Sequence, residues 1–177
     1  FDDQEVKDLR LNAFFEARED EQYKVAKVVE KVYDCFVIRS AELYLNKAEA
    51  EAMLDKAEAK QTIKTLLNNR FEGGIPDVDG LNEKDLISFI RDERRRELCF
   101  EAHRWFDLRR YAVSSKYPEK KSIRHETYDK NGVLEGDYVL KPYGEDPAWV
   151  LPIPGYEIVY NQGNLVDNPQ RVEMKLE

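Results

Sequence analysis

The sequence has few cysteines, no long hydrophobic run and no excess of basic residues. Cys35 and Cys99 are too far apart for a Cys-x-x-Cys motif and too few for a disulfide scaffold or a zinc site. No stretch approaches the roughly 18 consecutive apolar residues that a membrane-spanning helix requires. The formal net charge of −8 argues against a nucleic-acid-binding surface, because affinity for phosphates comes from clustered Lys and Arg.

What is present indicates a folded chain. Its 177 residues include ten Tyr, eight Phe and two Trp, far more aromatic residues than disordered chains carry. This length fits one domain with a sizeable core. The chain starts at Phe1 rather than Met, and no signal peptide or lipidation motif precedes Phe1. We therefore expect a processed chain or an excised fragment of a longer protein.

Composition divides the predicted single domain, residues 1–177, into three zones. In residues 1–36, the runs Leu11–Glu16 and Tyr23–Val29 flank a charged stretch and form a candidate β-hairpin. Residues 37–112 contain one proline and are predicted to be helical, whereas residues 113–177 are rich in loops with short strands. The predicted fold class is therefore mainly α, with a helical scaffold and short β-hairpins.

The helical zone begins with a predicted helix pair of repeat length. The first helix spans Val37–Met53, and the second spans roughly Lys56–Phe71 with Gly73-Gly74 as its C-cap. The pair covers about 35 residues, close to the ~34 of a tetratricopeptide unit. Either the following helices or neighbouring repeats must complete its packing. The predicted inward residues are Val37, Ala41, Tyr44, Leu45, Ala48 and Ala52 on the first helix, and Ala59, Ile63, Leu66 and Leu67 on the second.

Two further helices and one hairpin are predicted downstream. Asn82 is a good N-cap for a third helix, Asp85 takes the reciprocal capping position, and Leu81 and Leu86 occupy the hydrophobic-staple sites. A fourth helix covers about Arg104–Ala112.

Asn131-Gly132 is the strongest hairpin signal in the third zone, and it joins candidate strands near Ile123–Tyr128 and Val133–Leu140. Leu151–Pro154 is expected to be extended edge chain or coil, because its two prolines lack backbone N–H donors.

The segment Arg91–Glu97 interrupts the apolar face of the third helix with seven polar residues. At about 100° per residue, Glu93 and Glu97 fall within the inward stripe. A buried carboxylate needs a partner, and arginine meets it bidentately. We therefore expect a structural Arg–Glu network of Glu93, Arg94, Glu97 and Arg104. A remote alternative makes Glu93 and Glu97 the acid/base pair of a glycoside hydrolase.

Other candidate sites are few. No metal site or cofactor is predicted, since di-iron bundles need Glu-x-x-His and Phe100 stands three residues before His103. Loop aromatics stack against the apolar faces of sugar rings in many proteins, and here Tyr143 and Trp149 are the candidate ligand contacts. The other interpretation of these aromatics is that they cover a small core of their own. The aromatics in this group are Tyr117, Tyr128, Tyr138, Tyr143 and Trp149.

Three blocks of sequence resemble one known family. Glu93–Arg110 (ERRRELCFEAHRWFDLRR) closely resembles the ERRRELxFEGHRWFDLRR signature of the SusD/RagB family. Ile38–Ala50 is similar to the family's RxAExxLxxAEA helix, and Leu151–Pro154 with the later Asn168-Pro169 resembles its LPIPxxE…N…QNP ending. Ala102 replaces the signature's glycine, so either this position does not require positive φ or the helix junction differs here. The close Asp167–Gln170 also departs from the usual ending.

The resemblance implies the C-terminal part of a nutrient-binding lipoprotein at the cell surface, on the outer membrane. It implies a tetratricopeptide-containing scaffold that binds a glycan or other nutrient and passes it to a SusC-like TonB-dependent transporter. Membrane attachment would come only from a lipid anchor absent from this chain. The implied protein is not an enzyme, and no ligand-binding residue belongs to the matched motifs. The second hypothesis is a protein-interaction scaffold whose helix pair docks the transporter.

Overall fold

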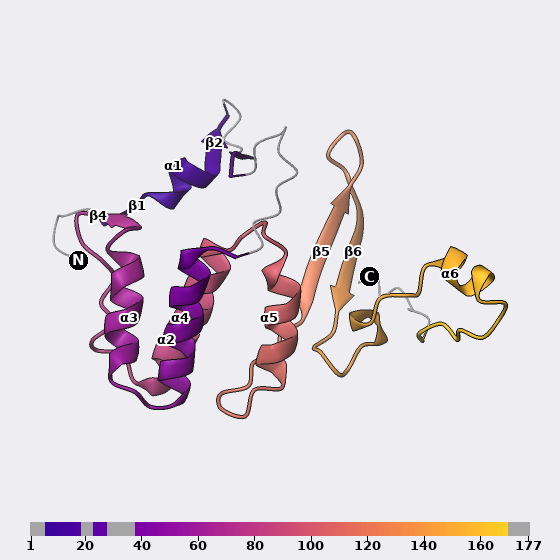
Figure 1. Ribbon diagram of the computed structural model, residues 1–177. Helices are drawn as coiled ribbons and strands as arrows, with labels where there is room; N and C mark the ends of the chain where they lie inside the picture. The colour runs from indigo at the N-terminus through magenta and orange to yellow at the C-terminus, as the bar shows by residue number, and fades with distance from the viewer. Residues whose placement is uncertain (1–5, 19–22, 28–37, 170–177) are drawn as a thin grey trace. The chain divides into compact units, whose positions relative to one another are not determined.

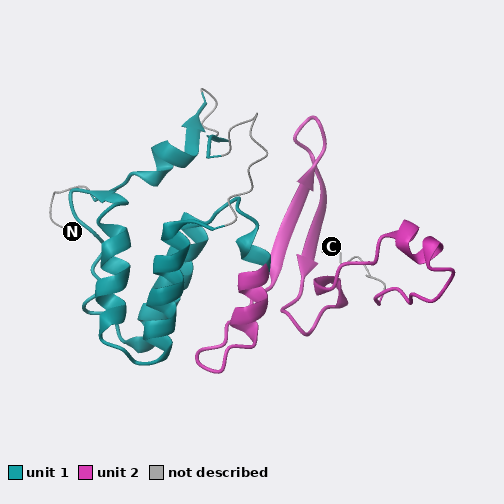
Figure 2. Cartoon of the chain, in the orientation of Figure 1, with its two compact units in different colours: residues 1–105 teal, residues 106–177 magenta. Residues whose placement is uncertain are grey.

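The computed structural model describes residues 6–18, 23–27 and 38–169 (Figure 1). Contacts divide the chain into two compact units, Phe1–Trp105 and Phe106–Glu177 (Figure 2). Within these described ranges helices dominate, and the strands form only two-stranded antiparallel pairs, which confirms the mainly α prediction. Among the described residues, no helix has the length and apolar character needed to cross a membrane.

Unit 1 is built on three helices that follow a short N-terminal segment (Figure 1). Helix α2 packs against both α3 and α4. The elements in chain order are β1 (Lys7–Asp8), α1 (Arg10–Phe14), β2 (Phe15–Ala17), β3 (Tyr23–Val25), α2 (Ser40–Met53), α3 (Glu58–Leu67), β4 (Phe71–Glu72) and α4 (Glu83–Glu97). Helix α5 (His103–Ala112) spans the boundary between the two units.

The core of unit 1 follows the predicted helical stripes, with two corrections. Leu45 and Ala48 of α2 and all four predicted inward residues of α3 are buried. Tyr44, however, is 42% exposed, so its prediction as an inward residue is wrong. Helix α2 begins at Ser40, and Val37 lies outside the described residues. The small side chains of Ala41, Ala48 and Ala52 leave little surface exposed and let α2 approach its neighbours closely.

The second helix of the pair is shorter than its pattern predicts. Helix α3 ends at Leu67, and Phe71–Glu72 forms strand β4, which pairs with Lys7–Asp8. Gly73 and Gly74 have φ of 80° and 141°, but they follow this strand, so their prediction as the helix C-cap is wrong. The signal for a left-handed turn was real. It belongs to the exit from strand β4, whose partner β1 lies more than 60 positions earlier in the sequence.

The N-terminal hairpin prediction is correct only for the end of the first run and the start of the second. Phe15–Ala17 pairs antiparallel with Tyr23–Val25, as a hairpin requires. The run from Leu11 is instead part of helix α1, which packs the buried Arg10 toward α4. Val28 and Val29, at the end of the second predicted run, lie outside the described residues.

The predicted third and fourth helices, α4 and α5, are confirmed. The Asn82 side chain accepts a hydrogen bond from the backbone N–H of Asp85 at 3.0 Å, so Asn82 is the N-cap of α4. Asp85 completes the cap by accepting from the Asn82 side-chain amide at 2.6 Å, and Leu86 is buried. Helix α5 begins at His103, one residue before the predicted start.

Unit 2 contains the predicted hairpin and two short helical turns. Strands β5 (Ile123–Tyr128) and β6 (Leu134–Leu140) pair antiparallel, and Gly132 has φ of 80° in the turn between them. Leu151–Pro154 is coil, as predicted. The pattern of residues did not predict the 3₁₀ turn η1 (Pro147–Trp149) or helix α6 (Gly155–Tyr160).

Candidate functional site

The charged segment of α4 divides into an inward and an outward face. Arg91, Glu93, Arg94 and Glu97 are buried, with both glutamates fully so. Asp92, Arg95 and Arg96 are on the outer side, where their side chains are about half exposed. The helical period alone produces this division, because positions 93 and 97 are one turn apart and share the stripe of Leu86 and Ile90.

Glu93 is held by two arginines from different segments. Arg10 of α1 donates to Glu93 Oε1, and Arg96 donates to Oε2 from Nη2 at 2.8 Å and from Nε at 3.1 Å. Arg10 also donates to Asp8 from Nε at 2.9 Å and from Nη2 at 2.8 Å. Burial lowers the pKa of the Arg10 guanidinium, but its bonds to Asp8 and Glu93 outweigh burial and raise the pKa above its ordinary value.

Glu97 receives arginines from three segments of unit 1. Arg39 Nη1 donates to Glu97 Oε1 at 2.5 Å. Arg70 donates to both carboxylate oxygens, from Nη2 to Oε1 at 2.9 Å and from Nε to Oε2 at 2.8 Å. Arg10 makes a longer bond to Oε2, at 3.3 Å. Burial would raise the pKa of Glu97, yet the bonds from Arg70 and Arg39 outweigh it and lower the pKa to about 2. Glu97 is therefore ionised at neutral pH and cannot donate a proton there.

Two basic side chains also donate hydrogen bonds to the C-terminal end of α4. Lys27 Nζ donates to the carbonyl oxygens of Glu97 at 2.6 Å and Cys99 at 3.1 Å, and Arg39 Nη2 donates to the Glu97 carbonyl at 2.5 Å. Positive charge at this end complements the helix dipole. Both cations also pair with Glu101. Burial would raise the pKa of Glu101, but its bonds from Arg39 and Lys27 prevail and lower it.

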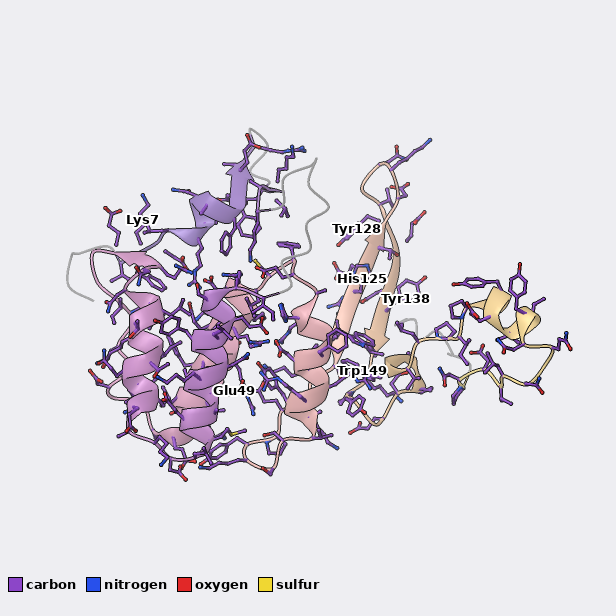
Figure 3. The ribbon with its side chains drawn as sticks, in the orientation of Figure 1. Lys7, Glu49, His125, Tyr128, Tyr138 and Trp149 are labelled. Atoms are coloured by element: carbon purple, nitrogen blue, oxygen red, sulfur yellow. The ribbon has the colours of Figure 1, made fainter. Side chains whose placement is uncertain are left out.

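A second set of ion pairs joins α4 to α2. Arg91 Nε donates to Glu49 Oε1 at 3.2 Å, and both side chains are buried; Figure 3 labels Glu49. Arg94 donates to Asn46 at 2.8 Å and to Glu42 at 3.4 Å. The acceptors on α2 recur at positions 42, 46 and 49, which is the spacing of a single helix face. This polar stripe continues the alanine-rich contact between the two helices.

The membership of the network differs from the prediction. Arg94 is buried, but it bonds to α2 rather than to Glu93 or Glu97. In the described part of the chain, no hydrogen bond or ion pair connects Arg104 to either glutamate. The arginines that do so are Arg10, Arg39, Arg70 and Arg96. Arg39 lies in the block similar to the family's RxAE helix, whereas no sequence signal marked Arg10 or Arg70.

Glu93, Glu97 and the four arginines that pair with them form the α4 cluster. A cavity of about 320 Å³ adjoins the α4 cluster. Its charged lining consists of Arg10, Lys27, Arg39, Arg70, Glu97 and Glu101. The cations pair with both carboxylates of this lining, Glu97 and Glu101. Each carboxylate therefore has an arginine beside it, and the cavity contains no protonated acid. A glycosidase needs one protonated and one ionised carboxyl group. Glu97 does not meet the first requirement.

The aromatic candidates form a small cluster in unit 2. Trp149 is only 2% exposed, and its indole N–H donates to the Lys141 carbonyl at 2.7 Å. The Tyr143 ring packs edge-to-face on Trp149 at 5.9 Å, and the Arg109 guanidinium lies 5.2 Å from the centroid of Tyr143. Figure 3 labels Trp149 near the base of the hairpin. The burial of Trp149 favours the other interpretation, in which these aromatics cover a small core of their own. A ligand contact at Tyr143 stays a prediction.

The chain between α4 and α5 contains two residues with positive φ, and one of them is Ala102. Ala102 has φ of 62°, and Phe100, two residues earlier, has φ of 63°. In this chain the position of the family's glycine is therefore left-handed, and an alanine adopts that conformation. L-residues disfavour this conformation because Cβ approaches the following carbonyl oxygen.

The described residues contain no cluster of three or more His, Cys, Asp or Glu side chains placed to hold a metal ion.

The fold and the cluster define a helical scaffold in which buried ion pairs fasten the central helix. Comparison with known proteins assigns this scaffold: the profile of the SusD family matches residues 11–170. The chain belongs to the SusD family.

Its relatives include two proteins of Formosa agariphila. SusD-like protein P2 is 28% identical over 75% of this chain and 25% of its own length. SusD-like protein P38 is 40% identical over 41% of this chain and 16% of its own length. This chain thus spans at most about a quarter of these curated relatives.

Two solved structures are also similar. A SusD-like protein from Bacteroides fragilis is 27% identical, with a TM-score of 0.48, over 76% of this chain and 25% of that chain. A SusD-like carbohydrate binding protein from Bacteroides vulgatus is 24% identical, with a TM-score of 0.45, over 72% of this chain and 29% of that chain.

Proposed function

We propose that this chain is the C-terminal part of a non-enzymatic glycan- or nutrient-binding protein of the cell surface. The protein would be anchored in the outer membrane by a lipid outside this sequence and would pass its ligand to a SusC-like TonB-dependent transporter. Membership of the SusD family is the observation that carries the proposal. The chain spans about a quarter of its relatives, so the ligand, the transporter and the anchor all belong to the proposal.

The electrostatics of the α4 cluster support a framework role over a catalytic one. Glu93 and Glu97 are fully buried, and each accepts hydrogen bonds from at least two arginines. The low pKa of Glu97 is the opposite of the raised pKa that a catalytic acid requires. Within this proposal the cluster holds segments of the scaffold together and performs no chemistry.

Glycan-array binding of the 177-residue chain, combined with an assay for new reducing ends, tests the proposal. We expect at least one polysaccharide to bind without release of reducing ends. Release of reducing ends that is lost in a folded Glu93→Gln variant would establish a glycoside hydrolase instead. Failure to bind any glycan on the array would contradict a glycan-binding role for this part of the protein.

A second candidate is a scaffold role in which the helix pair docks the transporter. The exposed apolar residues of α2 favour it: Leu43 is 59% exposed and Leu54, just beyond the helix, is 68% exposed. Eleven positions separate them, about three helical turns, so both lie on one side. In a pull-down with the SusC-like transporter, Leu43→Asp should reduce retention. The control Val166→Asp, at an 87% exposed position in unit 2, should leave retention unchanged.

A further inference from the structure

A second cavity of unit 1, of about 530 Å³, lies beside α1 and the end of α4. Its apolar lining comes from Leu11, Phe14, Phe15, Cys99 and Phe100. This volume falls within the range of roughly 300–1,000 Å³ that small-molecule sites occupy. The cavity shares Arg10 and Phe14 with the smaller, charged cavity described above, but neither Glu93 nor Glu97 lines it.

Aromatic rings form the most distinctive part of this lining. Phe15 contacts Phe100 edge-to-face, with ring centroids 6.0 Å apart and planes 73° apart. Phe15 also makes an edge-to-face contact with Tyr23, with ring centroids 6.3 Å apart. Rings arranged edge-to-face leave ring faces and edges for a further aromatic group, which gains energy beyond the burial of its area. A flat aromatic ligand therefore suits this lining.

Phe100 is the unusual residue of the set. Its φ of 63° is left-handed, which is rare for a bulky side chain, and 60% of its surface is exposed. Burial in the core therefore does not compensate for its backbone conformation. Its ring instead lines the cavity, in edge-to-face contact with Phe15. Residues with strained backbone cluster at active sites and ligand-binding sites.

The charged residues around the cavity are predominantly basic. Arg10, Arg95 and Arg96 line it together with one acid, Asp8, and Asp8 already accepts from Arg10 at 2.8 Å. Arg96 is bonded to Glu93. The Arg95 side chain is 56% exposed, and its contact with Asp92 is long, at 3.9 Å. Arg95 is thus the cation best placed to engage an anionic group on a ligand.

From these observations we propose that the cavity binds a small aromatic anion, a ring system that carries a carboxylate or sulfonate. The rings of Phe15 and Phe100 hold the apolar body, and Arg95 binds the anionic group. The site does not depend on the proposed glycan-binding function, because none of its evidence comes from the family.

Two fluorescent dyes with the same ring systems test both halves of the proposal. 1-Anilinonaphthalene-8-sulfonate carries the anionic group, and N-phenyl-1-naphthylamine lacks it. In titrations of the 177-residue chain, we expect the sulfonate to bind more tightly. Arg95→Gln should weaken the sulfonate about threefold to fivefold and leave the neutral dye unchanged, as for a partly exposed ion pair. Phe100→Ala should weaken both dyes about tenfold.

Matched controls locate the dye. Arg124→Gln, at an exposed arginine of β5, and Tyr160→Ala, at an 81% exposed aromatic of α6, should change neither titration. Bound sulfonate should also slow alkylation of Cys99, followed by mass spectrometry of the peptide that contains it. Equal affinity for the two dyes, loss of binding in Tyr160→Ala, or unprotected Cys99 would each overturn the proposal. Unchanged thermal unfolding of the Arg95 and Phe100 variants would show that they remain folded.

Discussion

Replacement of Glu97 by Gln is the sharpest test of the ion-paired framework. The substitution keeps the shape of the side chain but removes the charge that Arg10, Arg39 and Arg70 share. Arg10 would retain Asp8 and Glu93, and Arg39 would retain Glu101. Among the described residues, Arg70 would retain no carboxylate partner and would keep its bond to the carbonyl oxygen of Asn69, at 2.9 Å. Most of the loss should therefore come from Arg70.

The expected magnitude follows from the burial of the site. Removal of one partner of a buried ion pair destabilises a protein by about 3–5 kcal/mol, because the remaining charge stays desolvated. Glu97 is fully buried and two of its arginines are only about a quarter exposed, so this range applies. Urea unfolding at pH 7, followed by far-UV circular dichroism, gives the free energy of unfolding and the m-value.

The matched control lies on the same helix. Asp92 pairs with Arg95 at 3.9 Å, and both side chains are about half exposed. Asp92→Asn should change the free energy of unfolding by less than about 0.5 kcal/mol. A double-mutant cycle of Glu97→Gln with Arg70→Met should show a coupling of about 0.5–3 kcal/mol. Equal effects of Glu97→Gln and Asp92→Asn, at unchanged m-values, would refute the framework argument.

Three further predictions concern other parts of the chain. Because the folded pKa of Glu97 is about 2 and its ordinary value is 4.5, its contribution is complete above pH 4.5. As pH falls toward 2, the wild type should lose about 3 kcal/mol more than Glu97→Gln, measured by urea titrations across that range. Ala102→Gly should raise the melting temperature by about 2–4 °C, since glycine relieves the left-handed strain at φ 62°; a lower melting temperature would contradict this. Gly136→Ala should destabilise the chain by about 1 kcal/mol, because its Cβ would lie 2.5 Å from the Tyr138 ring, and little of this loss should remain in a Tyr138→Ala background.

The periodic parts of the sequence predicted the fold well. The inward residues of α3, the Asn82 cap of α4 and the β5–β6 hairpin all follow from local signals that act within a few residues. The N-terminal segment was harder to predict because its structure depends on distant partners. Strand β1 exists only through its pairing with β4, and α1 is fixed by the bond from Arg10 to α4.

The same distinction applies to the candidate site. Helical spacing alone placed Glu93 and Glu97 inside, and both are buried. Their partners could not be predicted, because Arg39 and Arg70 lie 58 and 27 positions from Glu97, and Arg10 lies 83 positions from Glu93. Any of the many arginines near α4 could have satisfied the carboxylates. Arg104 is close in sequence, yet it lies beyond the junction at Ala102, where the chain leaves α4 through two left-handed residues.

The use of charge rather than apolar packing at the end of α4 has a physical rationale. Three chain segments meet there, bearing Arg10, Arg39 and Arg70. An apolar contact would tolerate many relative placements of these segments, whereas a carboxylate with two lone-pair oxygens accepts planar guanidinium groups in few orientations. Desolvation offsets much of the attraction, so the cluster adds less stability than its number of bonds suggests. Replacing the entire cluster with apolar residues of similar volume should therefore cost less stability than Glu97→Gln alone, while loosening the position of α1.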